Sequence, residues 1–174
     1  MASDSNAFHI RAAETAEDGR LLIALIRKLA DFERLVGPDD DAAARMIEHG
    51  FACTPPKFEA LLAIDESVAD APGGAIGYAL YFETYSTFVG KPSLYLEDLF
   101  VLPDQRGRGV GKALLMRCIE TASARDYGRL EWSVLDWNTE AQRFYKSLGA
   151  EHLSEWHLYR LTEDSIRNLV ADEG

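Results

Sequence analysis

Short apolar stretches recur along the chain, and their residues alternate or run together in the way that is typical of β-strands. Turn signals such as Ala-Pro-Gly-Gly at 71–74 separate these stretches, so we predict strands there, with an antiparallel hairpin across that turn. The predicted strands cover residues 8–13, 58–64, 75–84, 94–102, 130–135 and 156–161.

A second pattern repeats every three to four residues and predicts helices between the strands. Thr15 and Asp18 form a capping-box signature before an apolar stripe that stops at the sequence Val-Gly-Pro, 36–38. Asn138 is placed to cap another helix, which Gly149 would end. Further helices are predicted from about residue 39 to Gly50, after Gly111, and as one or two turns within 162–170.

The order of these elements predicts an α+β architecture, because strands that first pair locally are followed by strands that alternate with helices. We therefore expect a mixed sheet with helices on its faces, a three-layer arrangement. A chain of 174 residues can bury one sizeable core and needs no second one. The prediction is a single domain, 1–174, whose core lies within about 8–161.

Charge and composition narrow the classes of function. The formal net charge of −11 disfavours nonspecific binding to nucleic acid and favours small cationic partners, although many acidic proteins are simply acidic. The sequence has no apolar run long enough to span a membrane, and its first residues do not resemble a signal peptide, so we expect a cytoplasmic protein. The two cysteines and four histidines lack the spacing of metal ligands or of a disulfide framework, and no metal is expected.

The segment Arg106-Gly107-Arg108-Gly109-Val110-Gly111 lies between a predicted strand and a predicted helix. Glycines allow close approach of the backbone to an anion, and the amides at a helix start attract phosphate oxygens. Arg106, Arg108 and Lys112 add three cations within seven residues of an otherwise acidic chain. The spacing fits neither a Walker loop nor a dinucleotide fingerprint. A loop that only caps the helix, with solvated arginines, remains the alternative.

Glu97 and Asp98 lie inside an apolar strand, where an unpaired carboxylate is unfavourable by roughly 2 kcal/mol or more. Such groups need either a partner or a chemical role. Side chains of adjacent residues in a regular strand point to opposite faces, and only a bulge would change that. Salt bridges to neighbouring arginines are the structural alternative.

The loop Arg106-x-x-Gly109-x-Gly111 resembles the acetyl-CoA signature of the GNAT N-acetyltransferases. The segments 95–101, 137–150 and 29–33 resemble the spermidine/spermine and thialysine acetyltransferase branch of that family. This resemblance implies a mostly antiparallel sheet, splayed between the strands at 94–102 and 130–135, with acetyl-CoA in the gap. The residues that it assigns to acetyl-CoA are Leu99, Phe100, Val101, Arg106, Gly107, Arg108, Gly109, Val110, Gly111, Lys112 and Asn138.

The resemblance also implies how the reaction is catalysed. A lysine-like amine is a free base in only about one molecule in a thousand at pH 7, so a group must remove its proton. We assign this task to Glu97, directly or through water, with Asp98 in support. Tyr145 is expected to act as the general acid toward the departing CoA sulfur. The residues alone, without the resemblance, favour a packing role for Tyr145 in the apolar stripe of its helix.

The expected acceptor is a small cationic amine, such as a polyamine, a diamine or a thialysine-like amino acid. Phe32, Glu33, Glu97 and Asp98 are the predicted amine-binding residues, and Phe32 stands where the polyamine acetyltransferases usually have a tyrosine. Two other functions stay open: acetylation of protein lysines or peptide N-termini, and noncatalytic sensing of acyl-CoA. The resemblance also implies a homodimer.

Overall fold

The computed structural model describes residues 8–171, and within that range five strands form one sheet. The strands are β1 (His9–Ala12), β2 (Glu59–Ile64), β3 (Ala75–Ser86), β4 (Lys91–Val101) and β5 (Leu130–Glu131), joined in the order β1-β2-β3-β4-β5. The first four strands are antiparallel to their neighbours, and β5 runs parallel to β4. The predicted mixed, mostly antiparallel sheet is therefore confirmed.

The helices are α1 (Ala16–Glu33), α2 (Asp40–Ile47), α3 (Val110–Ala124), α4 (Thr139–Ser147) and α5 (Glu163–Ala171). The described chain divides into two compact units, with the boundary between Ser133 and Val134. The first unit holds the sheet with α1, α2 and α3, and the second holds α4 and α5. No helix among residues 8–171 is both long and apolar enough to cross a membrane. The single domain and the cytoplasmic location stay predictions.

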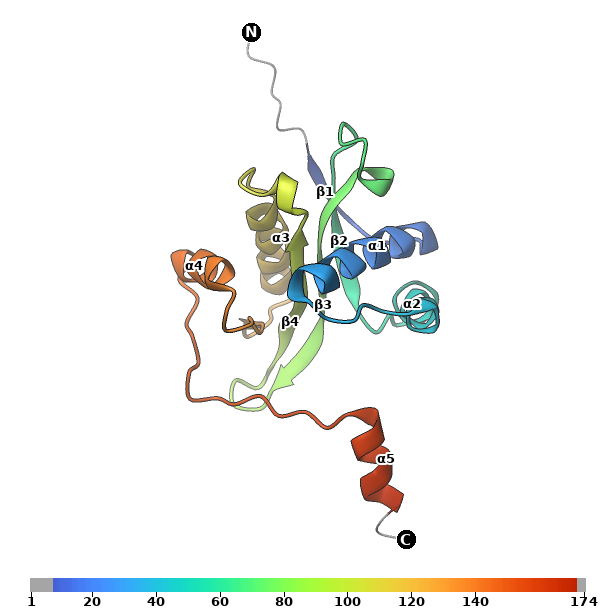
Figure 1. Ribbon diagram of the computed structural model, residues 1–174. Helices are drawn as coiled ribbons and strands as arrows, with labels where there is room; N and C mark the ends of the chain where they lie inside the picture. Colours follow the sequence, from blue (N-terminus) through green and yellow to red (C-terminus); the bar gives the residue numbers. More distant parts are fainter. Residues whose placement is uncertain (1–7, 172–174) are drawn as a thin grey trace. The chain divides into compact units, whose positions relative to one another are not determined.

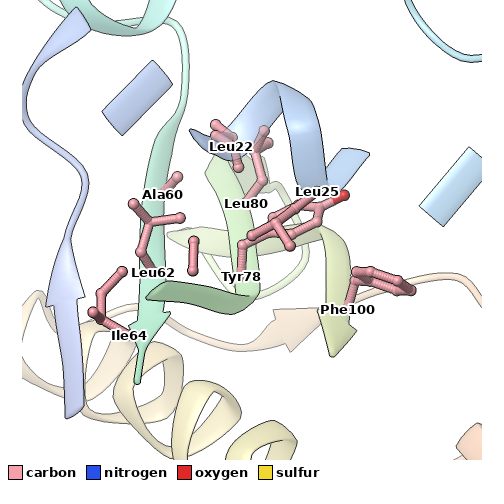
Figure 2. Close-up of a cluster of buried hydrophobic side chains, with 9 residues drawn as sticks. Leu22, Leu25, Ala60, Leu62, Ile64, Tyr78, Leu80 and Phe100 are labelled. Carbon is pink, nitrogen blue, oxygen red and sulfur yellow. The ribbon is translucent and has the colours of Figure 1, made fainter. Parts of the chain in front are cut away.

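In the first unit, α1 and α3 cover opposite faces of the sheet (Figure 1). Figure 2 shows Leu22 and Leu25 of α1 over apolar side chains from β2, β3 and β4. On the α1 face, the buried cluster also contains Ala60, Leu62, Ile64, Ala75, Tyr78, Leu80 and Phe100. The α3 face is closed by buried Val110, Leu114, Leu115 and Cys118. This two-sided packing fixes the middle of β4, where the candidate site lies.

The capping box predicted for the first helix is confirmed. The Thr15 side chain accepts a hydrogen bond from the Asp18 amide at 3.2 Å, and the Asp18 carboxylate accepts one from the Thr15 amide at 3.0 Å. Arg11 of β1 donates to the same carboxylate at 2.5 Å. These contacts, the Arg11 bond first, hold the pKa of Asp18 well below its usual range. The start of α1 is thereby tied to the edge of the sheet.

Asp18→Asn is expected to lower the free energy of unfolding at pH 7 by about 1–3 kcal/mol, because hydrogen bonds to a buried charge are lost. A carboxyl with a depressed pKa adds stability above its unfolded pKa, so the deficit should shrink as the pH falls below about 4. Urea unfolding at pH 7 and pH 3 measures both effects. Asp31→Asn, at an exposed position of the same helix, is the control. A deficit independent of pH would contradict this account.

Three sequence predictions about elements need correction. The strand predicted at 130–135 ends at Glu131, after two ladder pairs with β4. The helix predicted to end at Gly50 continues through a π-helical turn at Glu48–Ala52. No strand forms at 156–161. A strand requires a ladder partner, and this segment has none within the range that the structure describes.

Candidate active site

The glycine-rich segment forms the connection between β4 and α3. A 3-10 turn at Pro103–Gln105 follows β4, and Gly107 and Gly109 then take positive φ angles of 75° and 83°. Apart from the glycine itself and its two chain neighbours, no residue comes within 4 Å of the place where a side chain would begin at Gly107 or Gly109. Gly109 caps α3 without a side-chain hydrogen bond, so the first amides of the helix are left for other acceptors. This open backbone fits a pyrophosphate group.

The arginines of this segment contact the protein itself. The guanidinium carbon of Arg106 lies 4.5 Å from the centre of the Phe32 ring, and its Nε donates to the Val101 carbonyl at 3.2 Å. Arg108 forms an ion pair of 2.7 Å with Asp65. Lys112 is exposed on the first turn of α3. The sequence assigned the three cations to one anion, whereas the structure directs both arginines to neighbouring elements.

A β-bulge occurs at the two adjacent carboxylates of β4. Leu80 pairs with Asp98 and Tyr81 pairs with Leu96, so Glu97 is the extra residue without a partner on β3. Glu97 is exposed, and Asp98 is half-buried. The expectation that both carboxylates would be enclosed in apolar surroundings is thus wrong for Glu97, because the bulge turns it outward. Within residues 8–171, neither carboxylate forms an ion pair with an arginine.

Asp98 accepts a hydrogen bond from the Tyr78 hydroxyl at 3.0 Å. Tyr78 is fully buried on the α1 face, and Asp98 lies on that face next to it. Burial raises the pKa of Asp98 to about 6, the Tyr78 hydrogen bond opposes this shift, and the charges of Glu97 and Glu33 add to it. Burial, and then the nearby Asp98 charge, also raise the pKa of Tyr78 far above its usual range. Tyr78 is therefore a donor to an ionised Asp98 at neutral pH.

Glu33, at the last position of α1, completes a cluster of three carboxylates. Burial raises its pKa. Phe32 beside it packs against the apolar core and lies under Arg106. The structure thus brings together all four predicted amine-binding residues near the glycine-rich segment. A group of carboxylates with little compensation from cations attracts a positively charged ligand.

The end of β4 offers an open backbone edge. The β4–β5 ladder contains only the pairs Leu94–Leu130 and Tyr95–Glu131, so no strand within residues 8–171 flanks the rest of β4 on that side. Leu99 is half-buried, and Phe100 and Val101 are buried. Their side chains thus anchor the strand while one backbone edge stays open to an extended ligand. This early end of the ladder agrees with the expected splay of the sheet.

The two remaining site residues lie on α4, in the second unit. The Asn138 side chain caps this helix by accepting a hydrogen bond from the Ala141 amide at 3.1 Å, as predicted. Tyr145 is half-buried, and its ring centre lies 5.2 Å from that of Phe144. Of residues 134–171, none is fully buried. Tyr145 therefore lies on a partly exposed stripe of α4.

Sequence reasoning missed Tyr78 and Asp65. Tyr78 alternates with apolar residues in an ordinary strand pattern, and only the register of β3 against β4 reveals that it meets Asp98. Asp65 follows β2 at a position where an acidic residue normally marks a turn. For Tyr78, no signal in the sequence indicated a polar contact. For Asp65, the sequence did contain an indication. An acidic residue directly after an apolar strand is expected to form an ion pair or hydrogen bonds.

Metal and thiol chemistry receive no support from the described residues. No group of three or more His, Cys, Asp or Glu side chains suited to a metal ion occurs among residues 8–171. Cys118 is completely buried in α3, and burial raises the pKa of its thiol to about 12. Such a thiol stays protonated and packs as a small apolar side chain.

Comparison with known proteins defines the class. Residues 52–150 match the acetyltransferase (GNAT) family. A thialysine N-epsilon-acetyltransferase from Bos taurus is 36% identical over 167 residues, which are 93% of this chain and 96% of that protein. The human spermidine/spermine N(1)-acetyltransferase-like protein 1 is 30% identical over 169 residues, which are 95% of this chain and 24% of that protein.

A solved aminoglycoside N-acetyltransferase in complex with CoA has the same fold, with a TM-score of 0.72 and 23% identity, and the match covers 92% of this chain and 99% of that one. The chain belongs to the GNAT family of acetyltransferases. It is an N-acetyltransferase homologous to the thialysine and polyamine enzymes.

Proposed function

We propose that this enzyme transfers the acetyl group of acetyl-CoA to a primary amine of a small cationic compound, either a polyamine or diamine or a thialysine-like amino acid. The observation that carries this proposal is the cluster of Glu33, Glu97 and Asp98 next to the glycine-rich segment. Three carboxylates in one place favour an acceptor with more than one positive charge. Relatives named for thialysine and for spermidine/spermine support the same class of substrate.

For the donor, the residues present fit acetyl-CoA. The amides from Arg106 to Lys112 would hold its pyrophosphate, because the glycines leave this backbone open. The open edge of Leu99, Phe100 and Val101 would pair with the amide groups of the pantetheine arm. Asn138 would contact the donor near the start of α4. Acetyl-CoA, when bound, supplies an activated acetyl thioester.

The carboxylates have two tasks toward the amine. Asp98 and Glu33 attract and orient the ammonium form, since Asp98 is ionised above about pH 6 and Tyr78 holds it in place. Glu97, exposed on the bulge, accepts the proton that the amine loses and passes it to solvent. The bulge separates Glu97 from Asp98, so that Glu97 can remove the proton while Asp98 binds the amine.

Tyr145 completes the reaction by donating its hydroxyl proton to the departing sulfur. A thiol has a reference pKa near 8.5 and a phenol one near 10, so a phenol can hydrogen-bond to a developing thiolate and protonate it. Direct transfer in a ternary complex needs no covalent intermediate on the enzyme. Cys118 is buried and protonated, so it is not suited to carry the acetyl group.

Release of the CoA thiol tests the proposal. The purified enzyme is incubated with acetyl-CoA and a panel of diamines, polyamines, lysine analogues and short lysine peptides. We expect saturable thiol release with small amines that carry a second positive charge, and little with neutral amines of the same length. Faster turnover of peptides would replace this proposal by acetylation of protein lysines or peptide N-termini. Binding of acetyl-CoA without turnover of any acceptor would favour the sensor function.

A homodimer is part of the same proposal. Within a single chain, Trp156, Leu158, Tyr159 and Leu161 are each more than 60% exposed. Apolar side chains gathered on one segment are typical of a surface that another protein covers. Light scattering at micromolar concentration is expected to give twice the mass of one chain, and a monomer alone would contradict this part of the proposal.

A further inference from the structure

Asp65 follows the last residue of β2 and is almost completely buried, with 3% of its surface exposed. One carboxylate oxygen accepts hydrogen bonds from the amide and the hydroxyl of Ser67, at 3.0 and 2.6 Å. The other accepts from Nη2 of Arg108 at 2.7 Å. These contacts, first from Ser67 and then from Arg108, lower the pKa of Asp65 to about 2. Asp65 is therefore a fixed negative charge.

Arg108 belongs to the glycine-rich segment, and its guanidinium reaches from there to the β2–β3 connection. Its side chain is 23% exposed, and its Nη1 donates to the Gln105 side chain within the same segment. Both segments begin at the same end of β3. The Asp65 amide donates to the Gly74 carbonyl at 2.8 Å, and the Leu102 amide donates to the Ile76 carbonyl at 2.9 Å.

The Asp65–Arg108 contact holds the part of the segment between its two glycines, whereas Arg106, which precedes them, contacts Phe32 and the Val101 carbonyl. Gly107 and Gly109 flank Arg108, adopt positive φ angles and have open space where side chains would be. Glycine is the residue with the largest conformational freedom, and ordering it on binding weakens affinity. Arg108 is thus the one residue between the two glycines through which the rest of the protein can fix them.

We propose that Asp65 is a positioning residue that holds Arg108, and through it the backbone between Gly107 and Gly109, in the shape that receives the donor's pyrophosphate. In this arrangement Arg108 acts mainly through Asp65, and the backbone amides and the start of α3 carry the anion. The inference rests on the proposed function, since it assigns the site to acetyl-CoA.

The test is binding of two donors by isothermal titration or nuclear magnetic resonance. Acetyl-CoA contains the pyrophosphate, and S-acetylpantetheine lacks it. Asp65→Asn is expected to raise the Kd of acetyl-CoA by about 2- to 30-fold, the range typical of residues that act through a neighbour. The Kd of S-acetylpantetheine should change by less than about 2-fold, which separates positioning of the loop from a general loss of structure.

Glu59→Gln provides a matched control. Glu59 starts β2 and forms an ion pair with Arg125 at the end of α3, at 2.6 Å. It therefore joins the same strand and helix as the Asp65–Arg108 pair, but at their other ends. We expect Glu59→Gln to leave the Kd of both donors unchanged.

Arg108→Gln and the double variant complete the design. Arg108 lies on a surface loop, so Arg108→Gln keeps the test available if Asp65→Asn does not fold. The single and double variants should show a similar loss of acetyl-CoA affinity, because the Asp65–Arg108 contact is absent from all three. An unchanged or lower Kd in Asp65→Asn, or a loss only in Arg108→Gln, would overturn the inference and make Arg108 a direct ligand. Absence of acetyl-CoA binding to the wild type would instead overturn the proposed function itself.

Discussion

Tyr145→Phe is expected to lower kcat by about 100- to 10,000-fold, the usual contribution of a general acid. The hydroxyl is needed only as the sulfur departs, so KM for acetyl-CoA should change little. Steady-state thiol release with a diamine acceptor measures both constants. Phenylalanine keeps the ring, so the contact with Phe144 should persist in the variant.

Tyr85→Phe is the matched control, because Tyr85 is 63% exposed and lies at the end of β3 opposite the glycine-rich segment. Its kcat should equal that of the wild type. If Tyr145→Phe also kept its kcat within about twofold, another group would protonate the sulfur, and Tyr145 would have only a packing role.

Asp98→Asn is expected to increase stability and to weaken acceptor binding. The pKa of Asp98 is raised to about 6, so its ionisation at pH 7 opposes folding. A shift from about 4 to about 6 corresponds to roughly 3 kcal/mol, and solvent at the half-buried carboxylate reduces this to about 1–2 kcal/mol. Asparagine can still accept the Tyr78 hydrogen bond without carrying a charge.

The difference in unfolding free energy between Asp98→Asn and the wild type should depend on pH. A carboxyl whose folded pKa is raised adds most stability when it is protonated, and this contribution is lost as the pH rises through about 6. Asp98→Asn and the wild type should therefore have similar unfolding free energies at pH 4, and the variant should be more stable at pH 7. Urea unfolding at both values measures the difference, with the exposed Asp70→Asn as control.

Asp98→Asn should lower the catalytic efficiency toward a cationic amine at pH 7, although it raises stability. The wild-type kcat/KM for a cationic amine is expected to rise with pH through about 6 as Asp98 ionises, and Asp98→Asn should lose that rise. A variant that is less stable than the wild type at pH 7, or that keeps its acceptor KM, would show that Asp98 is a structural group.

The sequence predicted the elements that depend on local chemistry. Thr15, Asp18 and Asn138 cap their helices as expected, because a cap needs only residues within one turn. The glycine-rich segment was also identified, since its strand, loop and helix are continuous in the chain. By contrast, the strand predicted at 156–161 was wrong, because alternation does not supply a ladder partner from elsewhere in the chain.

The electrostatics of the site depend on register, which the sequence does not specify. The Tyr78–Asp98 bond joins residues 20 positions apart, and the Asp65–Arg108 pair joins residues 43 apart. The net charge led to the prediction of a cationic acceptor, which stays a prediction, and the assignment of Arg106 and Arg108 to the donor did not include their contacts within the protein. The sequence allowed a bulge at Glu97 but did not predict one. A single extra residue does not change the pattern of apolar and acidic residues in a recognisable way.

The bulge at Glu97 also divides β4 between two cores. Before it, Leu96 pairs with Tyr81 on the face that α3 covers; after it, Asp98 and Phe100 pair with Leu80 and Tyr78 on the α1 face. Even-numbered residues of β4 therefore face α3 before the bulge and α1 after it. An insertion or deletion of one residue here would exchange the faces of everything downstream, so chain length at this point is constrained as tightly as residue identity.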